Sequence, residues 1–149
     1  MSERSFLIIK PDSVRRGLIG EILAHLERKG LKIVAMKMIQ MTREQAEALY
    51  SPHKGKPFYE GLIQFMTSAP CVVLIVEAPD AIRQVRKLIG STDCKEAEPG
   101  TLRFTYGLST RYNLVHASDS EESFKRESSI FFNEDEILAY QRLGEEYLV

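Results

Sequence analysis

The sequence predicts an α/β or α+β fold, in which helices pack against one sheet. Short continuous apolar runs, typical of buried strands, alternate along the chain with segments whose apolar residues recur at helical spacing. A chain of 149 residues buries roughly 70% of its unfolded surface, so it needs neither disulfides nor a structural metal. We therefore expect a single domain over residues 1–149.

The N-terminal part is expected to contain a strand, a helix and a second strand. Residues 6–9 form an apolar run typical of a strand buried on both faces, and Pro11 ends it because proline lacks the N–H that a strand ladder needs. Leucine and isoleucine at helical spacing predict a helix from Leu18, which Gly30 stops. Residues 31–41 alternate in part between apolar and polar side chains and predict the second strand.

The middle of the chain is expected to contain two helices and the third strand. Thr42 and Gln45 have the spacing of a capping box, which predicts a helix start. A loop rich in proline, glycine and serine covers residues 51–57, and an amphipathic stretch follows around residues 62–65. Residues 71–77 begin with a continuous apolar run and predict a strand.

The C-terminal part is expected to contain a helix, a loop, a short strand and a last helix. The first helix lies between Asp80 and Gly90, and a polar loop follows over residues 91–101. A short apolar run then predicts a strand that ends at His116. Hydroxyl and acidic residues come next, and their oxygens suit the N-terminus of a helix over residues 120–131. We therefore expect His116 at a rigid strand-to-helix junction.

The composition argues against several classes of protein. The 20 lysines and arginines against 21 acidic residues leave a net charge of -1, which argues against general nucleic-acid binding. Two cysteines cannot form a disulfide framework, and they favour a reducing compartment. The N-terminus does not resemble a signal peptide, and the longest apolar run is far shorter than the ~20 residues that cross a bilayer. We expect a cytoplasmic protein that binds neither a membrane nor a specific nucleic acid.

His116 is the strongest candidate for a catalytic side chain. Ser118 and Asp119 follow it, but a Ser-His-Asp hydrolase is not favoured, because triad members normally come from distant parts of a chain. Ser118 also lacks the Gly-x-Ser-x-Gly context of a nucleophile elbow. From these residues alone, a structural histidine remains an alternative. The sequence has no Walker P-loop and no Gly-x-Gly-x-x-Gly motif, so cationic side chains would have to hold any phosphate.

Two motifs carry a resemblance to a known family. Residues 113–120 read Asn-Leu-Val-His-Ala-Ser-Asp-Ser, and Lys-Pro-Asp stands upstream at residues 10–12. In both, the chain resembles the nucleoside diphosphate kinases, whose active-site signature is Asn-x-x-His-Gly/Ala-Ser-Asp-Ser. Further matches follow in the family's order: Arg16–Gly20, Arg86, Thr92, Pro99–Arg103 and Glu127. The resemblance, which spans about residues 4 to 140, implies a ferredoxin-like sandwich, a four-stranded antiparallel sheet with helices over one face.

The resemblance also implies a reaction. His116 would accept the terminal phosphate of a nucleoside triphosphate such as ATP and pass it to a nucleoside diphosphate, in a reversible ping-pong transfer. Imidazoles are ordinarily mostly neutral at pH 7, so no separate base is needed. Glu127 corresponds to the carboxylate that orients the ring, with Ser118 completing that link. Lys10 would supply positive charge beside the transferring group. The implied catalytic residues are His116, Lys10, Glu127 and Ser118.

Several side chains match the family's phosphate-binding residues. Besides Lys10, these are Arg86 and Arg103, whose planar guanidinium groups suit phosphate oxygens, and Thr92 and Tyr50, which carry hydroxyls. Without the resemblance, the arginines would be taken for surface charges, and Lys10 for a lysine that protects a strand edge.

The remaining implied contacts concern the nucleoside, a metal and other copies of the chain. Asn113 corresponds to a ribose-binding residue, Phe58 to the aromatic side chain on which the base stacks, and Leu62 to a residue at the mouth of the site. Mg²⁺ is implied as a cofactor held mainly by nucleotide phosphates, since the sequence contains no cluster with the spacing of protein ligands. A homo-oligomer, either hexamer or tetramer, is implied as well, and the apolar Tyr147–Val149 could join its interface.

Two departures from the family pattern and two alternatives qualify this interpretation. Phe104 follows Arg103 where many relatives have glycine, and could crowd that loop. Cys94 stands where proline is frequent, and could loosen the loop that holds Thr92. A catalytically silent nucleotide-binding or scaffold relative would be expected to lack His116, a key lysine or an arginine, yet none is missing. A regulatory or RNA-binding domain would need exposed aromatics and a basic face.

Overall fold

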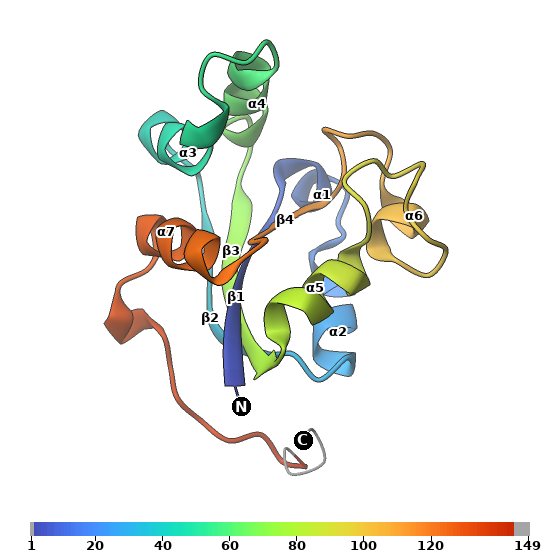
Figure 1. Ribbon diagram of the computed structural model, residues 1–149, viewed down its shortest axis with the longest axis vertical. Helices are drawn as coiled ribbons and strands as arrows, with labels where there is room; N and C mark the ends of the chain where they lie inside the picture. Colours follow the sequence, from blue (N-terminus) through green and yellow to red (C-terminus); the bar gives the residue numbers. More distant parts are fainter. Residues whose placement is uncertain (1, 145–149) are drawn as a thin grey trace.

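The computed structural model, which describes residues 2–144, contains one four-stranded antiparallel sheet (Figure 1). Its strands are β1 (Ser2–Ile9), β2 (Lys32–Ile39), β3 (Cys71–Pro79) and β4 (Val115–Ala117), in the spatial order β2-β3-β1-β4. This order confirms the ferredoxin-like sheet that the family resemblance implied. The apolar tail expected at an interface, Tyr147–Val149, lies outside the described residues.

The strands are longer than their apolar runs. β1 was expected over residues 6–9 but begins at Ser2, because the polar Ser2–Ser5 segment pairs with the end of β3, from Ser2 opposite Pro79 to Ser5 opposite Val76. β3 extends to Pro79 for the same reason. Ladder hydrogen bonds come from the backbone, so a strand continues for as long as its partner does, whatever its side chains.

Helices and short 3-10 turns connect the strands. The α-helices are α1 (Pro11–Arg15), α2 (Ile19–Arg28), α3 (Arg43–Leu49), α4 (Tyr59–Met66), α5 (Ala81–Ile89), α6 (Leu102–Tyr106) and α7 (Glu121–Phe131), with 3-10 turns η1 (Ser51–His53) and η2 (Glu134–Glu136). The capping box at α3 is confirmed, since Thr42 accepts from the Gln45 N–H at 3.1 Å and the Gln45 side chain accepts in return at 3.0 Å.

Two short helices, α1 and α6, were not predicted. Pro11 ends β1 as expected, but it also occupies the first position of α1, where its missing N–H leaves no hydrogen bond unmade. α6 begins at Thr101, whose hydroxyl accepts from the Phe104 N–H at 3.2 Å. Both helices have five residues, too few to show a helical repeat in the sequence.

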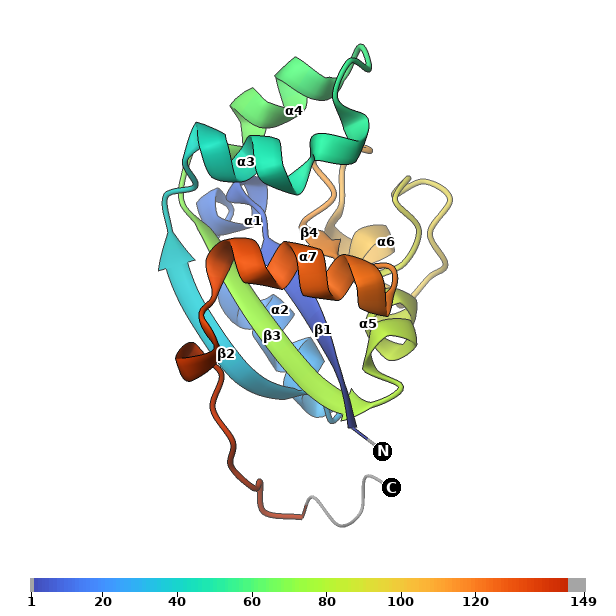
Figure 2. The same cartoon turned by 60° about the vertical axis from the view of Figure 1, so that its left-hand side comes forward.

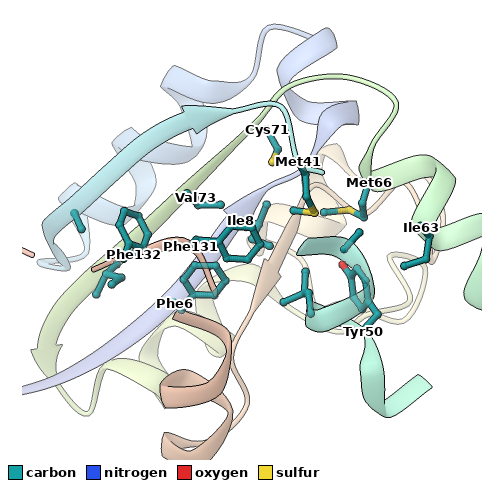
Figure 3. Close-up of a cluster of buried hydrophobic side chains, with 14 of the residues drawn as sticks. Phe6, Ile8, Met41, Tyr50, Ile63, Met66, Cys71, Val73, Phe131 and Phe132 are labelled. Carbon is teal, nitrogen blue, oxygen red and sulfur yellow. The ribbon is translucent and has the colours of Figure 1, made fainter. Parts of the chain in front are cut away.

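Helices cover both faces of the sheet, whereas one covered face was expected. Phe6 and Ile8 of β1 face one cluster, in which the Phe6 ring stacks on Phe131 of α7 at 5.5 Å between centroids (Figure 3). Leu7 and Ile9 face the opposite cluster, which includes residues of α2 and α5. Figure 2 shows α7 lying across β1 and β3 on the first face. Successive side chains of a strand point to opposite faces of the sheet. The continuous apolar run at residues 6–9 of β1 therefore requires packed helices on both faces.

The topology brings three distant segments together at one end of the sheet. β4 pairs with β1 so that His116 lies opposite Ile8, one residue before the end of β1 at Ile9. Lys10 follows directly, and its backbone N–H donates to the Leu114 carbonyl at 2.9 Å. α7 begins four residues after β4, with Ser120 capping it as predicted. Among residues 2–144, no helix is both long and apolar enough to cross a membrane.

Candidate active site

A cleft of about 760 Å³ lies at this end of the sheet and gathers nearly all the predicted site residues. Its lining includes Lys10, Tyr50, Phe58, Leu62, Arg86, Thr92, Arg103, Asn113, His116 and Glu127. These residues come from five elements, α4, α5, α6, β4 and α7, and from the segments that connect elements, so the fold, rather than local sequence, assembles them. Ser118 is fully buried and lies behind the lining, where it can act only through another side chain.

The His116 imidazole is held by a buried carboxylate. Its Nε2 lies 2.8 Å from Oε1 of Glu127, and the Ser118 hydroxyl donates to the same oxygen at 3.0 Å. Arg126 donates to the other oxygen, Oε2, at 3.3 Å. Only 5% of Glu127 is exposed, although it belongs to a helix whose first turn is solvated. The predicted links from Glu127 to His116 and Ser118 are therefore present.

This contact determines which ring nitrogen is nucleophilic. An ionised carboxylate can only accept hydrogen bonds, so Nε2 must carry the proton that it shares with Glu127. In the neutral ring Nδ1 then keeps its lone pair. The Tyr50 ring packs edge-on against the imidazole, 5.9 Å between centroids, and restricts its rotation. The geometry is that of an aimed nucleophile with Nδ1 as its reactive atom.

Lys10 and Asn113 form a buried polar contact in the cleft. Lys10 Nζ donates to Asn113 Oδ1 at 2.7 Å, and Asn113 Nδ2 donates to the Thr92 carbonyl at 3.1 Å. Burial, with the Arg103 guanidinium nearby, lowers the pKa of Lys10 to about 8. A lysine that is 6% exposed with no carboxylate bound to its ammonium group is suited to receive an anion.

The two predicted phosphate clamps differ from one another. Arg103 is buried, and its guanidinium donates to the carbonyls of Gly90, Asn113 and Val115. A guanidinium carries five N–H groups, so two are left for a ligand. Burial and the nearby Arg86 lower the pKa of Arg103 to about 10. Arg86 is exposed and makes one long contact, to the Ala117 carbonyl at 3.4 Å. Arg103 therefore holds backbone in place, a role that the sequence did not reveal.

The mouth of the cleft is exposed. Phe58 lies just before α4 with 45% of its surface accessible, its ring 5.4 Å from that of His53, and Leu62 lies one turn further along the helix. Thr92, on the opposite loop, is also exposed. The positions suit the predicted contacts with a base and with phosphate oxygens, because the exposed ring presents a face and the hydroxyl is free to rotate.

Sequence reasoning missed several residues of the lining, of which Arg111 is the most notable. It borders both this cleft and an adjoining cavity of about 640 Å³, and within the described residues its guanidinium has no hydrogen-bonding partner. It lies so close to Gly61 that a Cβ there would sit 2.8 Å from Nη2. Its position two residues before Asn113 was the available signal. Other lining residues that were missed are His53, Thr110, Asp119, Ser123 and Arg126.

Neither departure from the family pattern disrupts the cleft. Phe104 is 48% exposed on α6, while Arg103 beside it keeps all three backbone contacts, so the ring does not displace the guanidinium. Cys94 is buried, and its thiol donates to the Ser109 carbonyl at 3.3 Å. This contact ties the loop that carries Thr92 to the segment before Asn113, which opposes the expected loosening.

The acidic residues of the cleft do not form a protein metal site. Within residues 2–144, no group of three or more His, Cys, Asp or Glu side chains could hold an ion. Glu127 is engaged by His116 and Ser118, and Asp119 accepts from the Ser123 hydroxyl at 2.7 Å, which lowers its pKa. The donor set around the buried end of the cleft is cationic, so a divalent metal could enter only with anionic ligands of its own.

Comparison with known proteins agrees with this geometry. A family model described as nucleoside diphosphate kinase matches residues 3–137. The nucleoside diphosphate kinase of Staphylothermus marinus is 57% identical over 137 residues, covering 92% of this chain and 97% of that one. The corresponding protein of Ignicoccus hospitalis is 56% identical over 136 residues, covering 91% and 92%.

Solved structures give the same result. A halophilic nucleoside diphosphate kinase from Halobacterium salinarum, in complex with CDP, superposes with a TM-score of 0.97 at 43% identity, covering 100% of this chain and 99% of that one. The Aquifex aeolicus nucleoside diphosphate kinase gives a TM-score of 0.90 at 39% identity, with coverage of 93% and 100%. On sequence, fold and the geometry of its cleft, this chain belongs to the nucleoside diphosphate kinase family.

Proposed function

We propose that this chain is a nucleoside diphosphate kinase that transfers the terminal phosphate of a nucleoside triphosphate to a nucleoside diphosphate through a phosphohistidine on His116. The observation that carries the proposal is the contact between His116 Nε2 and Glu127, which in the neutral ring leaves the lone pair on Nδ1, within a cleft lined by Lys10, Arg86 and Arg103. Such a ring is a nucleophile that needs no separate base, and the cations suit a polyphosphate.

Transfer proceeds in two displacements. Nδ1 attacks the terminal phosphorus, a P–N bond forms as the P–O bond to the β-phosphate oxygen breaks, and the bond electrons remain on that oxygen. The growing negative charge is offset by the cations of the cleft. Glu127 stabilises the phosphorylated ring, which carries a positive charge, through its contact with the Nε2 proton. The terminal oxygen of a second nucleoside diphosphate then attacks phosphorus, and the P–N electrons return to Nδ1.

Recognition of the nucleotide is divided between the two ends of the cleft. At the buried end, Asn113 contacts the ribose. Lys10 occupies one lone pair of its Oδ1 and the Thr92 carbonyl one N–H of its Nδ2, so one acceptor and one donor position remain for the sugar hydroxyls. Tyr50 carries a buried hydroxyl without a hydrogen-bonding partner among the described residues, which suits a donor to a phosphate oxygen. At the mouth, Phe58 and Leu62 contact the base without reading its hydrogen-bonding edge, so all the common bases are accepted.

Mg²⁺ enters as part of the substrate complex. The cationic lining fits an ion that is held by nucleotide oxygens and water, and Asp119 is a carboxylate of the lining that would be able to bind such water. Such an ion would supply positive charge that offsets part of the charge of the phosphates. Lys10, Arg86 and Arg103 neutralise the remaining charge.

The chain acts as one domain over residues 1–149, in the cytoplasm, within a homo-oligomer. β2 is an edge strand, and its Met36 and Met38 are 50% and 58% exposed. An edge strand with exposed apolar side chains favours pairing with a second copy. We favour a hexamer over a tetramer, and light scattering on the purified chain distinguishes the two by mass.

Labelling with γ-labelled ATP tests the function. We expect the wild-type chain to acquire one label that is stable in alkali and lost in acid, mapped to His116, and to release it to any added nucleoside diphosphate. A label on serine, or none at all, contradicts the proposal. The second outcome would instead support the alternative of a silent nucleotide-binding relative, which calorimetry with ADP would detect as binding without turnover.

A further inference from the structure

The backbone just before the catalytic strand adopts a conformation that leucine rarely tolerates. Leu114 has a φ of +79°, and the Val115 N–H donates to the Asn113 carbonyl at 2.9 Å, which closes a three-residue γ-turn. This left-handed form of the γ-turn is rare and strained. Leu114 is also fully buried, so its side chain anchors the turn in the core. A strained turn between Asn113 and His116 must be held by its surroundings.

The first turn of α1 holds it from one side. Asp12 Oδ2 accepts from the Leu114 N–H at 3.2 Å, and the Ser13 hydroxyl donates to the Leu114 carbonyl at 2.9 Å. The Lys10 backbone N–H donates to the same carbonyl at 2.9 Å. The backbone N–H and the carbonyl of Leu114 are thus both bound by residues 10–13, about 100 positions earlier in the sequence.

Arg103 holds the turn from the other side. Its guanidinium donates to the carbonyls of Asn113 and Val115, the residues that flank Leu114. Lys10 Nζ also binds the Asn113 side chain. The result is a backbone fixed on both faces at the point where the chain passes from a ribose-binding residue to the nucleophile. Strain of this kind persists only where the surroundings determine the conformation several times over.

A purely local role for Asp12 does not account for these contacts. An acidic residue in the first turn of a helix is commonly stabilised by the helix dipole, but that role needs no burial. Asp12 is 8% exposed, and burial raises its pKa, an energetic cost that its hydrogen bond to Leu114 partly offsets. Ser13 is wholly buried and aims at a carbonyl that already has a donor in Lys10.

We infer that Asp12 and Ser13 are positioning residues for phosphoryl transfer, which hold the Leu114 peptide in its strained turn and thereby set the placement of His116 and Asn113. The inference rests on the proposed transfer through His116. Neither residue touches the nucleotide in this scheme. A displacement of about 1 Å at a reacting group can cost about 100-fold in rate, so an indirect effect of this kind is measurable.

The test compares Asp12→Ala, Asp12→Asn and Ser13→Ala in the full chain. The rate of His116 labelling is measured in a single turnover at saturating γ-labelled ATP, at a temperature well below each variant's melting point. Asp12→Ala should slow labelling by about 10–100-fold. Asp12→Asn retains an oxygen that can accept from the Leu114 N–H and should recover most of that loss. Ser13→Ala should show a smaller decrease, since Lys10 still donates to the carbonyl.

Ser5→Ala is the matched control for Ser13→Ala. Ser5 is also fully buried, but its hydroxyl has no hydrogen-bonding partner among the described residues and it does not line the cleft. Its labelling rate should equal that of the wild type. If Asp12→Ala and Ser13→Ala lower the melting temperature yet label within twofold of the wild type, the two residues are merely structural and the inference is wrong. The same follows if Asp12→Asn is as slow as Asp12→Ala.

The ¹⁵N resonances of the His116 ring separate this inference from the proposed function. Asp12→Ala should shift these resonances in the nucleotide-free protein, because the contact with Glu127 is altered, whereas Ser5→Ala should not. Unchanged resonances in Asp12→Ala would overturn the inference even in an active enzyme. A wild-type chain that fails to label contradicts the phosphohistidine instead. The ¹⁵N shift of the His116 ring in Asp12→Ala would then still test whether Asp12 positions that ring.

Discussion

The cleft has a buried end and an exposed mouth, and they are built differently. The buried end, formed by Lys10, Asn113, His116 and Glu127 with Ser118 behind them, has every side chain hydrogen-bonded to another part of the protein. The mouth, formed by Phe58, Leu62, Arg86 and Thr92, has two exposed polar side chains with few contacts, and an aromatic ring that is 45% exposed. One part is held rigid, and the other is accessible.

The contrast shows how the two tasks of such an enzyme are separated. Chemistry needs reacting groups held to within a fraction of an ångström, which only buried, multiply bonded side chains provide. Recognition of many nucleotides needs a surface that tolerates different bases, which an open aromatic face provides. Changes at the buried end should therefore lower kcat, and changes at the mouth should raise KM.

His116→Ala should have the largest effect. Exchange between ATP and another nucleoside diphosphate should fall by at least about 10⁴-fold, because the proposed phosphoryl carrier, the imidazole held by Glu127, is lost. The readout is a coupled assay of nucleoside triphosphate formation. His25→Ala, a histidine on α2 outside the cleft, should leave the rate unchanged. A His116→Ala variant that retained a hundredth of the activity would show that the buried end is not the site of transfer.

Glu127→Ala comes next. Loss of the carboxylate frees the imidazole to rotate and removes the group that stabilises charge on Nε2, so kcat should fall by about 10–100-fold with little change in KM. Steady-state kinetics measure the two constants separately. Glu122→Ala, an exposed acid on the same helix, is the control. A rise in KM at constant kcat would assign Glu127 to binding and remove the distinction between the two ends.

The pH dependence of kcat/KM tests the charge on Lys10. Because burial lowers the pKa of Lys10 to about 8, the free enzyme should lose this cation as pH rises through that value. kcat/KM should then fall by up to about tenfold per pH unit, and Lys10→Arg should move the fall to higher pH. A profile of the wild type that stayed flat to pH 10 would contradict a buried, titrating Lys10.

Stability should respond to the same group in the opposite direction. Between about pH 8 and the ordinary lysine pKa of 10.5, the unfolded chain binds a proton that folded Lys10 has released. The free energy of unfolding from this group therefore rises with pH across that window. Denaturant titrations of the wild type and of Lys10→Met measure this rise as a slope against pH that Lys10→Met lacks, and the contribution of Lys10 to that slope should vanish below pH 7.

Phe58→Ala should have the smallest effect. Loss of a half-exposed stacking surface costs about 1 kcal/mol, so KM should rise about fivefold for every nucleotide, with kcat unchanged. Phe104→Ala removes a ring that is similarly exposed, at 48%, but lies outside the cleft, and it should leave both constants unaltered. A large decrease in kcat for Phe58→Ala would mean that the mouth also positions the reacting groups.

Prediction from sequence succeeded where the signal is local. The buried strand at residues 71–77, the capping box at Thr42 and the cap at Ser120 all lie within a few residues of what they determine, and each is confirmed. α1 and α6 were missed because five residues cannot display a helical repeat. The packing of helices on both faces of the sheet was missed, because an apolar run does not reveal which other elements pack against it.

Within the site, residue types were predictable but their connections were not. The family motifs identified His116, Lys10, Asn113 and Glu127, all of which lie in the cleft. The roles of Arg103 as a backbone brace and of Asp12 as a clamp on Leu114 depend on contacts with segments far away along the chain. Arg111 was overlooked for a related reason, since its position two residues before Asn113 was the only local signal, and its contacts with the cleft depend on the fold.

The sequence by itself determined the strands and the longer helices, the candidate nucleophile and the family, because these depend on short-range patterns and on motifs that occur in a fixed order along the chain. Only the tertiary structure decided which ring nitrogen of His116 is free, which arginine is buried, and what holds the backbone at Leu114 in a strained turn. Those properties arise from hydrogen bonds between residues up to about 100 positions apart, which exist only once β1 and β4 pair and bring the two segments together.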